Sequence, residues 1–134
     1  MTDSKTKLKE VLAIMNIMFL ISDKDTTLSH QDYIKVIKNF YDLDIDRRRV
    51  SQILNDLYDI GQENNDYFPF FEIKESEKGK GKFYIDKTDL KGVSKIIKGI
   101  DTTRSLTSEE RKNIISYIYS FFTENEKKEI KTWL

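Results

Sequence analysis

Apolar residues recur at steps of three and four over the first sixty positions, which predicts three amphipathic helices. The first is expected at residues 5–21. The second follows the N-cap residue Ser29, with Asp32 completing a capping box, and the third follows Asp46 and ends at Gly61. The expected buried residues are Leu8, Val11, Leu12, Met15, Met18 and Phe19 in the first helix, Tyr33, Ile34, Ile37 and Phe40 or Tyr41 in the second, and Val50, Ile53, Leu54, Leu57 and Ile60 in the third.

The period of the pattern changes near residue 70. Segments 70–74 and 82–86 alternate apolar and polar residues and flank a turn at 76–81 that is rich in Gly and Lys, so they predict a β-hairpin. Its apolar face is expected to hold Phe71, Ile73, Phe83 and Ile85. Three helices followed by a hairpin are the layout of a winged helix-turn-helix.

Helical patterns return after the hairpin, first at 88–100 and then behind two capping boxes, Thr107 with Glu110 and Thr123 with Glu126. We expect a mainly helical α+β fold with a DNA-binding domain at 1–90 and a helical extension at 91–134. The extension carries more apolar surface than short helices usually hide, which favours dimerisation, the alternative being packing onto the first helix. The expected dimerisation residues are Ile114, Ile118, Phe121, Phe122 and Trp133.

Composition narrows the class of protein. With 134 residues, 38% of them hydrophobic and 34% charged, the chain is expected to form one compact domain or a small domain with an appended element. The chain has no cysteine, which excludes disulfides and cysteine nucleophiles and suits the cytoplasm. The apolar run at 11–21 is too short to span a bilayer, so we expect no membrane segment. Net charge is zero, and any nucleic-acid binding must therefore come from local patches.

Candidate catalytic chemistry is sparse. The single histidine, His30, has no neighbouring serine or glycine elbow that would suggest a triad, and the sequence GKGKF at 79–83 lacks the spacing of a phosphate-binding loop. The acidic clusters lack the glycine and distal glutamate of a calcium loop. We therefore expect no enzyme activity, no metal and no cofactor.

The start of the third helix is more informative, because Arg47, Arg48 and Arg49 stand at the positive end of the helix dipole, where cations are disfavoured. A phosphate would offset that cost, so Arg47 and Arg49 are predicted to bind phosphates beside the free N–H groups of the first turn. The outward face suits a major groove, and the predicted base-reading residues are Arg48, Ser51, Gln52 and Asn55. The alternative is an ordinary solvated polar face.

The hairpin tip adds Lys78, Lys80 and Lys82, which we predict to hold phosphates from a wing at 74–84. A lysine-rich edge also protects a hairpin from strand-to-strand aggregation, so this patch has a purely structural alternative.

Two segments, LSHQDYIKVIKNFYDLDIDRRRVSQILNDLYDIG and IKESEKGKGKFYIDKTDL, resemble the N-terminal winged helix-turn-helix of bacterial WYL-domain transcriptional regulators. Residues 93–122 are similar to the helical linker of that family. The resemblance implies that Asp46 is the N-cap, that Arg47 and Arg48 face DNA, and that Val50 and Leu57 are core residues. Gln52 and Ile53 stand where the family often has an Arg-Asp pair. The chain ends before a WYL ligand-sensing domain, which implies a reduced regulator.

The resulting hypothesis is a prokaryotic or phage transcriptional regulator, a repressor, that binds double-stranded DNA sequence-specifically as a homodimer. The recognition helix, 46–60, would lie in the major groove and the wing on the backbone. The main alternative is a phage or mobile-element winged-helix protein that inhibits a host nucleic-acid enzyme by protein binding. A replication or plasmid-partition protein would use the same helix on DNA.

Overall fold

The computed structural model describes residues 3–68, 71–77, 81–87 and 89–134. The chain divides into two compact units, Met1–Asp86 and Lys87–Leu134, which we call the first and second unit and describe separately. Within the described residues the fold is mainly helical, with a two-stranded antiparallel sheet. The boundary between units lies after Asp86, four residues before the predicted one.

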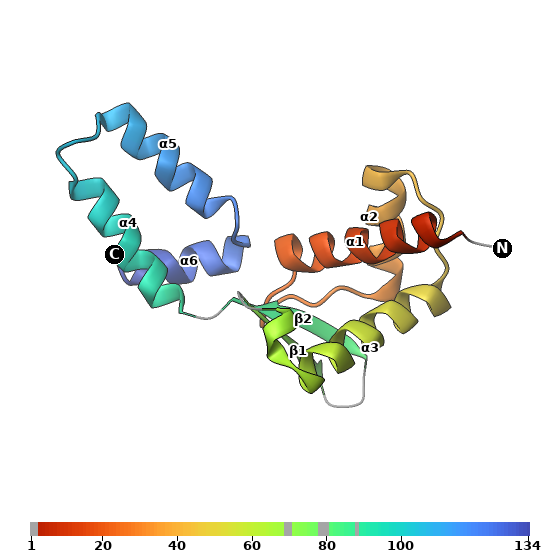
Figure 1. The fold of residues 1–134 in the computed structure, drawn as a ribbon. Coiled ribbons are helices and arrows are strands. Elements are labelled where there is room, and N and C mark those ends of the chain that lie inside the picture. The colour runs from red at the N-terminus through yellow and green to blue at the C-terminus, as the bar shows by residue number, and fades with distance from the viewer. Residues whose placement is uncertain (1–2, 69–70, 78–80, 88) are drawn as a thin grey trace. The chain divides into compact units, whose positions relative to one another are not determined.

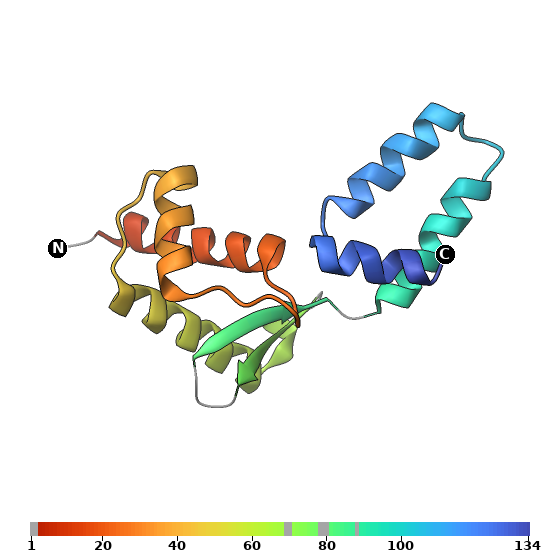
Figure 2. The same ribbon diagram turned by 180° about the vertical axis from the view of Figure 1, so that it is seen from behind.

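Three helices and a hairpin make up the first unit (Figure 1). The elements are α1 (Ser4–Ile21), α2 (His30–Tyr41), α3 (Arg47–Glu63), the short 3-10 helix η1 (Asn65–Tyr67), β1 (Glu72–Glu77) and β2 (Lys82–Asp86). Each of the three long helices packs against the other two, while β1 packs on α3 and β2 on α1. Seen from behind, the hairpin lies at the C-terminal end of α3 (Figure 2).

Side-chain caps start α2 and α3 where the sequence predicts them. The Ser29 hydroxyl accepts from the Asp32 N–H while the Asp32 carboxylate accepts from the Ser29 N–H, so the predicted capping box of α2 is confirmed. At α3 the Asp46 carboxylate accepts from the Arg49 N–H at 2.7 Å, which confirms the predicted N-cap. Each cap satisfies a backbone donor that the helix itself leaves without a partner.

The core of the first unit confirms most of the predicted faces of α2, α3 and the hairpin, but α1 is rotated relative to the prediction. Leu8 and Leu12 are 59% and 53% exposed instead of buried, because α1 turns inward the side that holds Glu10, Ala13, Ile14 and Ile17. The prediction also placed Phe40 or Tyr41, and Ile60, inward, whereas all three are exposed. The buried apolar residues are Ala13, Ile14, Ile17, Met18, Tyr33, Ile37, Ile45, Val50, Ile53, Leu54, Leu57, Ile73, Phe83 and Ile85.

Two boundaries around the hairpin differ from the prediction. Helix α3 continues past Gly61 to Glu63. Gly61 leaves room for the Phe68 ring, which would lie 3.2 Å from a Cβ added at this position. Strand β1 runs from Glu72 to Glu77 and so begins two residues later than predicted. Its register with β2 shifts between Glu75 and Glu77. That shift accommodates one extra residue in β1, as a bulge does.

The second unit contains α4 (Leu90–Thr102), α5 (Ser108–Tyr119) and α6 (Glu124–Thr132), with α4 packed on both others. Both predicted capping boxes of this unit are present. The Glu126 carboxylate of one box also accepts from the Lys87 ammonium at 2.8 Å, and both side chains are buried. Because a buried charge is costly without a partner, this ion pair secures the start of the unit to α6.

Candidate nucleic-acid interface

The N-terminal end of α3 presents two free cations. Arg47 and Arg48 follow the Asp46 cap directly and both are exposed. Among the residues that the structure describes, neither forms an ion pair. No acidic residue lies in the first turn of this helix, so nothing within the turn neutralises the two guanidinium groups. Exposed cations beside free helix N–H groups form a suitable surface for a phosphate.

Arg49 differs from its two neighbours because its guanidinium group already has partners within the chain, and its predicted phosphate contact stays a prediction. Its Nε donates to Glu10 Oε1 at 3.1 Å, and its Nη1 donates to Gln52 Oε1 at 3.1 Å. The Glu10 side chain is only 7% exposed, so its carboxylate requires a counter-ion, and Arg49 supplies it. Sequence reasoning missed this pair because a lone glutamate in an apolar run is usually assigned to the solvent side.

The predicted base-reading residues do share the outward side of α3, but part of their hydrogen-bonding capacity is already used. Asn55 Nδ2 donates to the Ser51 carbonyl oxygen at 2.8 Å and lies 3.3 Å from Ser51 Oγ. The Gln52 carbonyl oxygen accepts from Arg49. A bidentate contact of Gln52 with adenine would need that oxygen as well as the amide N–H. Of the four, Arg48 is therefore the readiest to contact a base.

Charge along the exposed side of α3 reverses towards its C-terminal end. Arg47 and Arg48 open the helix, whereas Asp56, Asp59 and Glu63 are exposed further along it. A phosphate backbone would be repelled from that second half. In helix-turn-helix complexes the N-terminal residues of the recognition helix contact the base edges, so this distribution is compatible with DNA at the first turns alone.

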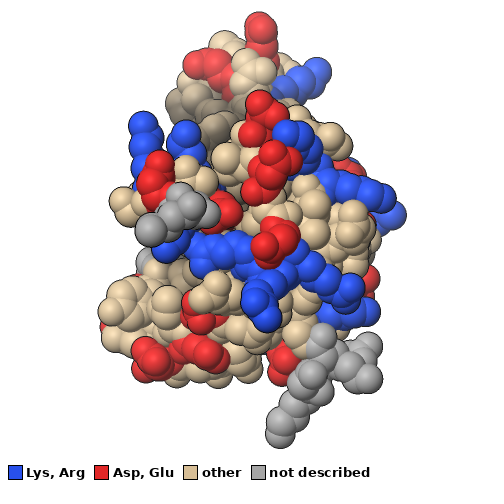
Figure 3. All heavy atoms as spheres, turned by 90° about the vertical axis from the view of Figure 1, so that its right-hand side faces the viewer, with Lys and Arg blue, Asp and Glu red and all other residues tan. Residues whose placement is uncertain are grey.

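Lys and Arg side chains gather on the side of the first unit that carries the N-terminal ends of α1 and α3 (Figures 1 and 3). The Arg49–Glu10 bond fixes the first turn of α3 beside the N-terminal half of α1. Lys7 is exposed and stands three residues before Glu10, one helical turn away, and so adds a cation on the same side of α1. Sequence reasoning did not include Lys7, because the packing of α1 on α3 and the bond between Arg49 and Glu10 cannot be seen in the sequence.

His30 begins α2 and lies close enough to Arg47 to be affected by its charge. Partial burial, and then the positive charge of Arg47, lower the pKa of His30 below its ordinary value. The imidazole is therefore largely neutral at neutral pH. A phosphate bound at Arg47 would act in the opposite direction and favour the protonated form.

Of the three lysines predicted to hold phosphates from the hairpin, the structure describes one. Lys82 is exposed on β2, whereas Lys78 and Lys80 lie outside the described residues. Lys74 donates to Asp86 at 2.6 Å, and this partner raises the pKa of Lys74. Within the described part of the hairpin, Lys82 remains the candidate for a phosphate contact.

The predicted dimerisation residues of the second unit are partly exposed. Ile114, Phe121 and Trp133 are exposed, and Ile118 and Phe122 are half-buried. Phe121 already packs edge-on against Tyr117, with ring centroids 5.1 Å apart. The Lys91 ammonium lies 4.9 Å from the centroid of the Trp133 ring. Some of this apolar surface is thus covered from within the unit.

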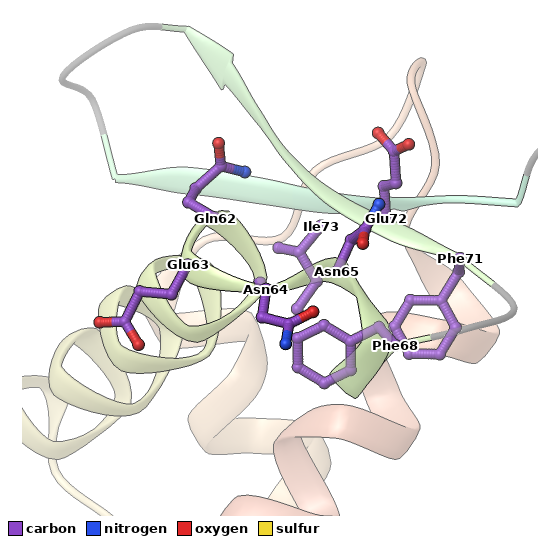
Figure 4. A pocket seen from close by; sticks show the side chains of 9 residues that line it. Gln62, Glu63, Asn64, Asn65, Phe68, Phe71, Glu72 and Ile73 are labelled. Atoms are coloured by element: carbon purple, nitrogen blue, oxygen red, sulfur yellow. The ribbon is translucent and has the colours of Figure 1, made fainter.

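A pocket of about 410 Å³ lies between the C-terminal end of α3 and β1 (Figure 4). Its wall carries the carboxylates of Glu63 and Glu72, amides including Asn64, and the stacked rings of Phe68 and Phe71, whose centroids are 5.3 Å apart. Two carboxylates at the negative end of a helix disfavour phosphate. The charge of this pocket therefore does not suit a phosphate.

Comparison of the chain with protein-family models, curated proteins and solved structures finds no match. No helix in the described part of the chain combines the length and the apolar character that crossing a membrane requires. Inferences about function therefore rest on the geometry above.

Proposed function

We propose that the first unit is a winged helix-turn-helix that binds double-stranded DNA and represses transcription. Helix α3 would enter the major groove through its N-terminal turns, and the hairpin would contact the backbone. The observation that carries the proposal is a pair of exposed arginines at a helix N-terminus, Arg47 and Arg48, which form no ion pair with any residue that the structure describes. Cations at that end destabilise an isolated helix, and a bound phosphate reverses the effect.

The roles of the three arginines separate on this proposal. Arg49 forms the ion pair with Glu10 and so fixes the first turn of α3 against α1. Arg47 binds a phosphate, because it is exposed in the first turn beside free N–H groups. Arg48, one position further round the helix, reaches a guanine edge, which offers two acceptors to a guanidinium. Lys7 and Lys82 add sequence-independent contacts with the backbone.

The order of elements supports the same proposal. Three packed helices followed by an antiparallel hairpin match the layout of this class of DNA-binding domain. The resemblance of residues 28–61 and 73–90 to the WYL-regulator winged helix agrees with it, and on that basis we propose a regulator of the same general kind.

A selection of bound duplexes from a random pool, with the full chain at physiological salt, tests the proposal. The expected result is an enriched motif with guanine at one or more fixed positions. The alternative of an enzyme inhibitor would be favoured by two results together. The selection would enrich no motif, and the chain purified from its natural host after nuclease treatment would retain one host protein stoichiometrically.

A further inference from the structure

Helix α1 is apolar on two opposite sides. One side forms part of the core. On the other side Met15 and Phe19 pack partly against the core, with the centroid of the Phe19 ring 5.5 Å from that of the Phe71 ring, while Leu8 and Leu12 are exposed. Successive residues are rotated by about 100° in an α-helix, so Leu8, Leu12, Met15 and Phe19 fall within about 60° of one another. Glu10 lies on the opposite side, in contact with Arg49. Leu8 and Leu12 are more than half exposed, and Met15 and Phe19 are half-buried. We call these four residues the α1 seam.

We propose that the α1 seam pairs with the same seam of a second copy of this chain, with the two helices antiparallel. The residues are spaced by four, three and four positions, the alternation of a coiled-coil seam. This spacing reads the same in both directions. An antiparallel copy therefore places Leu8 opposite Phe19 of its partner and Leu12 opposite Met15, with a two-fold axis between them.

The charges of α1 favour a second copy in the antiparallel direction. Lys5 and Lys9 are exposed on the flank of the seam near the N-terminal end, where the helix dipole disfavours cations. The last turn of α1 has no basic residue, and the two exposed residues that follow it, Lys24 and Asp25, carry opposite charges, so the negative end of the helix dipole is not neutralised within the helix. In an antiparallel pair, the lysines of each copy lie beside the negative end of the other helix. In a parallel pair, the lysines of both copies would gather at one end and repel each other.

The position of α3 relates this pairing to DNA binding, a step that rests on the proposed function. Helix α3 packs on the side of α1 opposite the seam, so the dimer would have the order α3, α1, α1 and α3. Packed helices lie 8–10 Å apart, which separates the two α3 helices by about 24–30 Å. That is close to the distance of about 34 Å between successive major grooves on one face of DNA.

Sedimentation equilibrium of the full chain without DNA tests the seam over a range of concentrations. We expect a monomer–dimer equilibrium in which Leu12→Glu, and independently Leu8→Glu, raises the dimer Kd by at least about tenfold. Phe40→Glu is the matched control, since Phe40 is the more exposed at 79% and lies on α2 of the same unit. This control should leave the Kd unchanged.

Three outcomes would overturn the proposal. The first is a monomer at every concentration. The second is a dimer that is lost in Phe121→Glu and kept in Leu12→Glu, which would assign dimerisation to the second unit. The third is a monomer whose melting temperature falls in both seam variants, because the seam would then be covered within one chain. Circular dichroism spectra identical to wild type establish that the variants fold.

Charge neutralisation tests the direction of the helices. Lys5→Gln with Lys9→Gln should weaken the dimer, most strongly at low salt, if the pair is antiparallel, because each copy loses its attraction to the negative end of the other helix. In a parallel pair the same change removes the repulsion between lysines, so a tighter dimer would contradict the proposal. The control is Lys112→Gln with Lys128→Gln, which changes the net charge equally on exposed positions of the second unit. Because no DNA is present, these results do not depend on the proposed function.

Discussion

Arg49 and Glu10 join the first turn of the third helix to the middle of the first helix, with Nε 3.1 Å from Oε1. The carboxylate is nearly inaccessible, and the guanidinium side chain retains about a quarter of its exposure. The same arginine also contacts Gln52. One side chain thus neutralises a buried charge, relates two helices and occupies part of the predicted base-reading face.

Removing the two partners should have unequal effects on stability. Arg49→Ala leaves the buried Glu10 carboxylate without a counter-ion, so we expect a loss of about 2–4 kcal/mol in the free energy of unfolding. Glu10→Ala leaves an arginine that can reach water and should cost less, about 1–2 kcal/mol. Urea denaturation of both variants measures the difference. Equal losses would argue against a buried charge as the cause.

The pKa of His30 tests its proximity to Arg47. The chain has one histidine, so its imidazole resonance can be followed through a pH titration by NMR without ambiguity. We expect a pKa below 6.5 in wild type and a higher value in Arg47→Ala, since the guanidinium charge disfavours the protonated ring. An unchanged pKa of His30 in the variant would show that the Arg47 charge does not act on the His30 ring.

The sign of the linkage follows from that shift. Because folding lowers the pKa of His30, the unfolded chain binds the proton more tightly, and its contribution to stability is lost as the pH falls from about 6.5 towards the folded value. His30→Gln should therefore flatten the pH dependence of unfolding in this range. A wild-type stability that rises on acidification there would contradict the assignment.

Two glycines of α4 should respond in opposite ways to alanine. Asp89 caps this helix by accepting from the Gly92 N–H, and a Cβ on residue 92 would collide with that carboxylate. Gly92→Ala should therefore displace the cap and destabilise the protein by about 1 kcal/mol, despite the better helix propensity of alanine. Gly99 has open space around it, and Gly99→Ala should stabilise by about 0.5–1 kcal/mol. Thermal melts of the two variants compare them directly.

Substitutions in α3 should change base specificity, whereas a substitution in the hairpin should change the affinity for all duplexes. Arg48→Ala should relax the preference at one base position, which is worth about 1–3 kcal/mol, and Gln52→Ala should have a smaller effect because Arg49 already occupies its oxygen. Lys82→Ala should weaken binding to all duplexes alike and reduce the salt slope by about one. Binding measured on the selected motif and on its single-base variants resolves these cases.

Local signals in the sequence were enough for the caps and for most buried faces. Ser29, Asp46, Thr107 and Thr123 act within four residues, so their motifs specify their structures. The orientation of α1 could not be predicted in this way, because its two sides are both apolar. The choice between them depends on Arg49, which is 39 positions away from Glu10.

The same contrast between local signals and long-range contacts holds for the candidate site. The exposure of Arg47 and Arg48 followed from helical periodicity around Val50 and Leu57. The pairing of Arg49 with Glu10, and the position of Lys7 near the start of α3, both depend on the long-range contact between α1 and α3. Gly61 was read as a helix end, whereas the neighbouring Phe68 ring gives it a packing role within the helix.

The affinity of the full chain for its selected duplex, measured by fluorescence anisotropy with wild type and Arg47→Ala/Arg48→Ala, tests the central claim most directly. The control is Arg104→Ala/Lys112→Ala, which removes two exposed cations from the second unit. We predict that the α3 variant loses at least about 100-fold in affinity at physiological salt, while the control stays within about threefold of wild type. Equal affinities for the two variants would contradict a DNA-binding role for the start of α3.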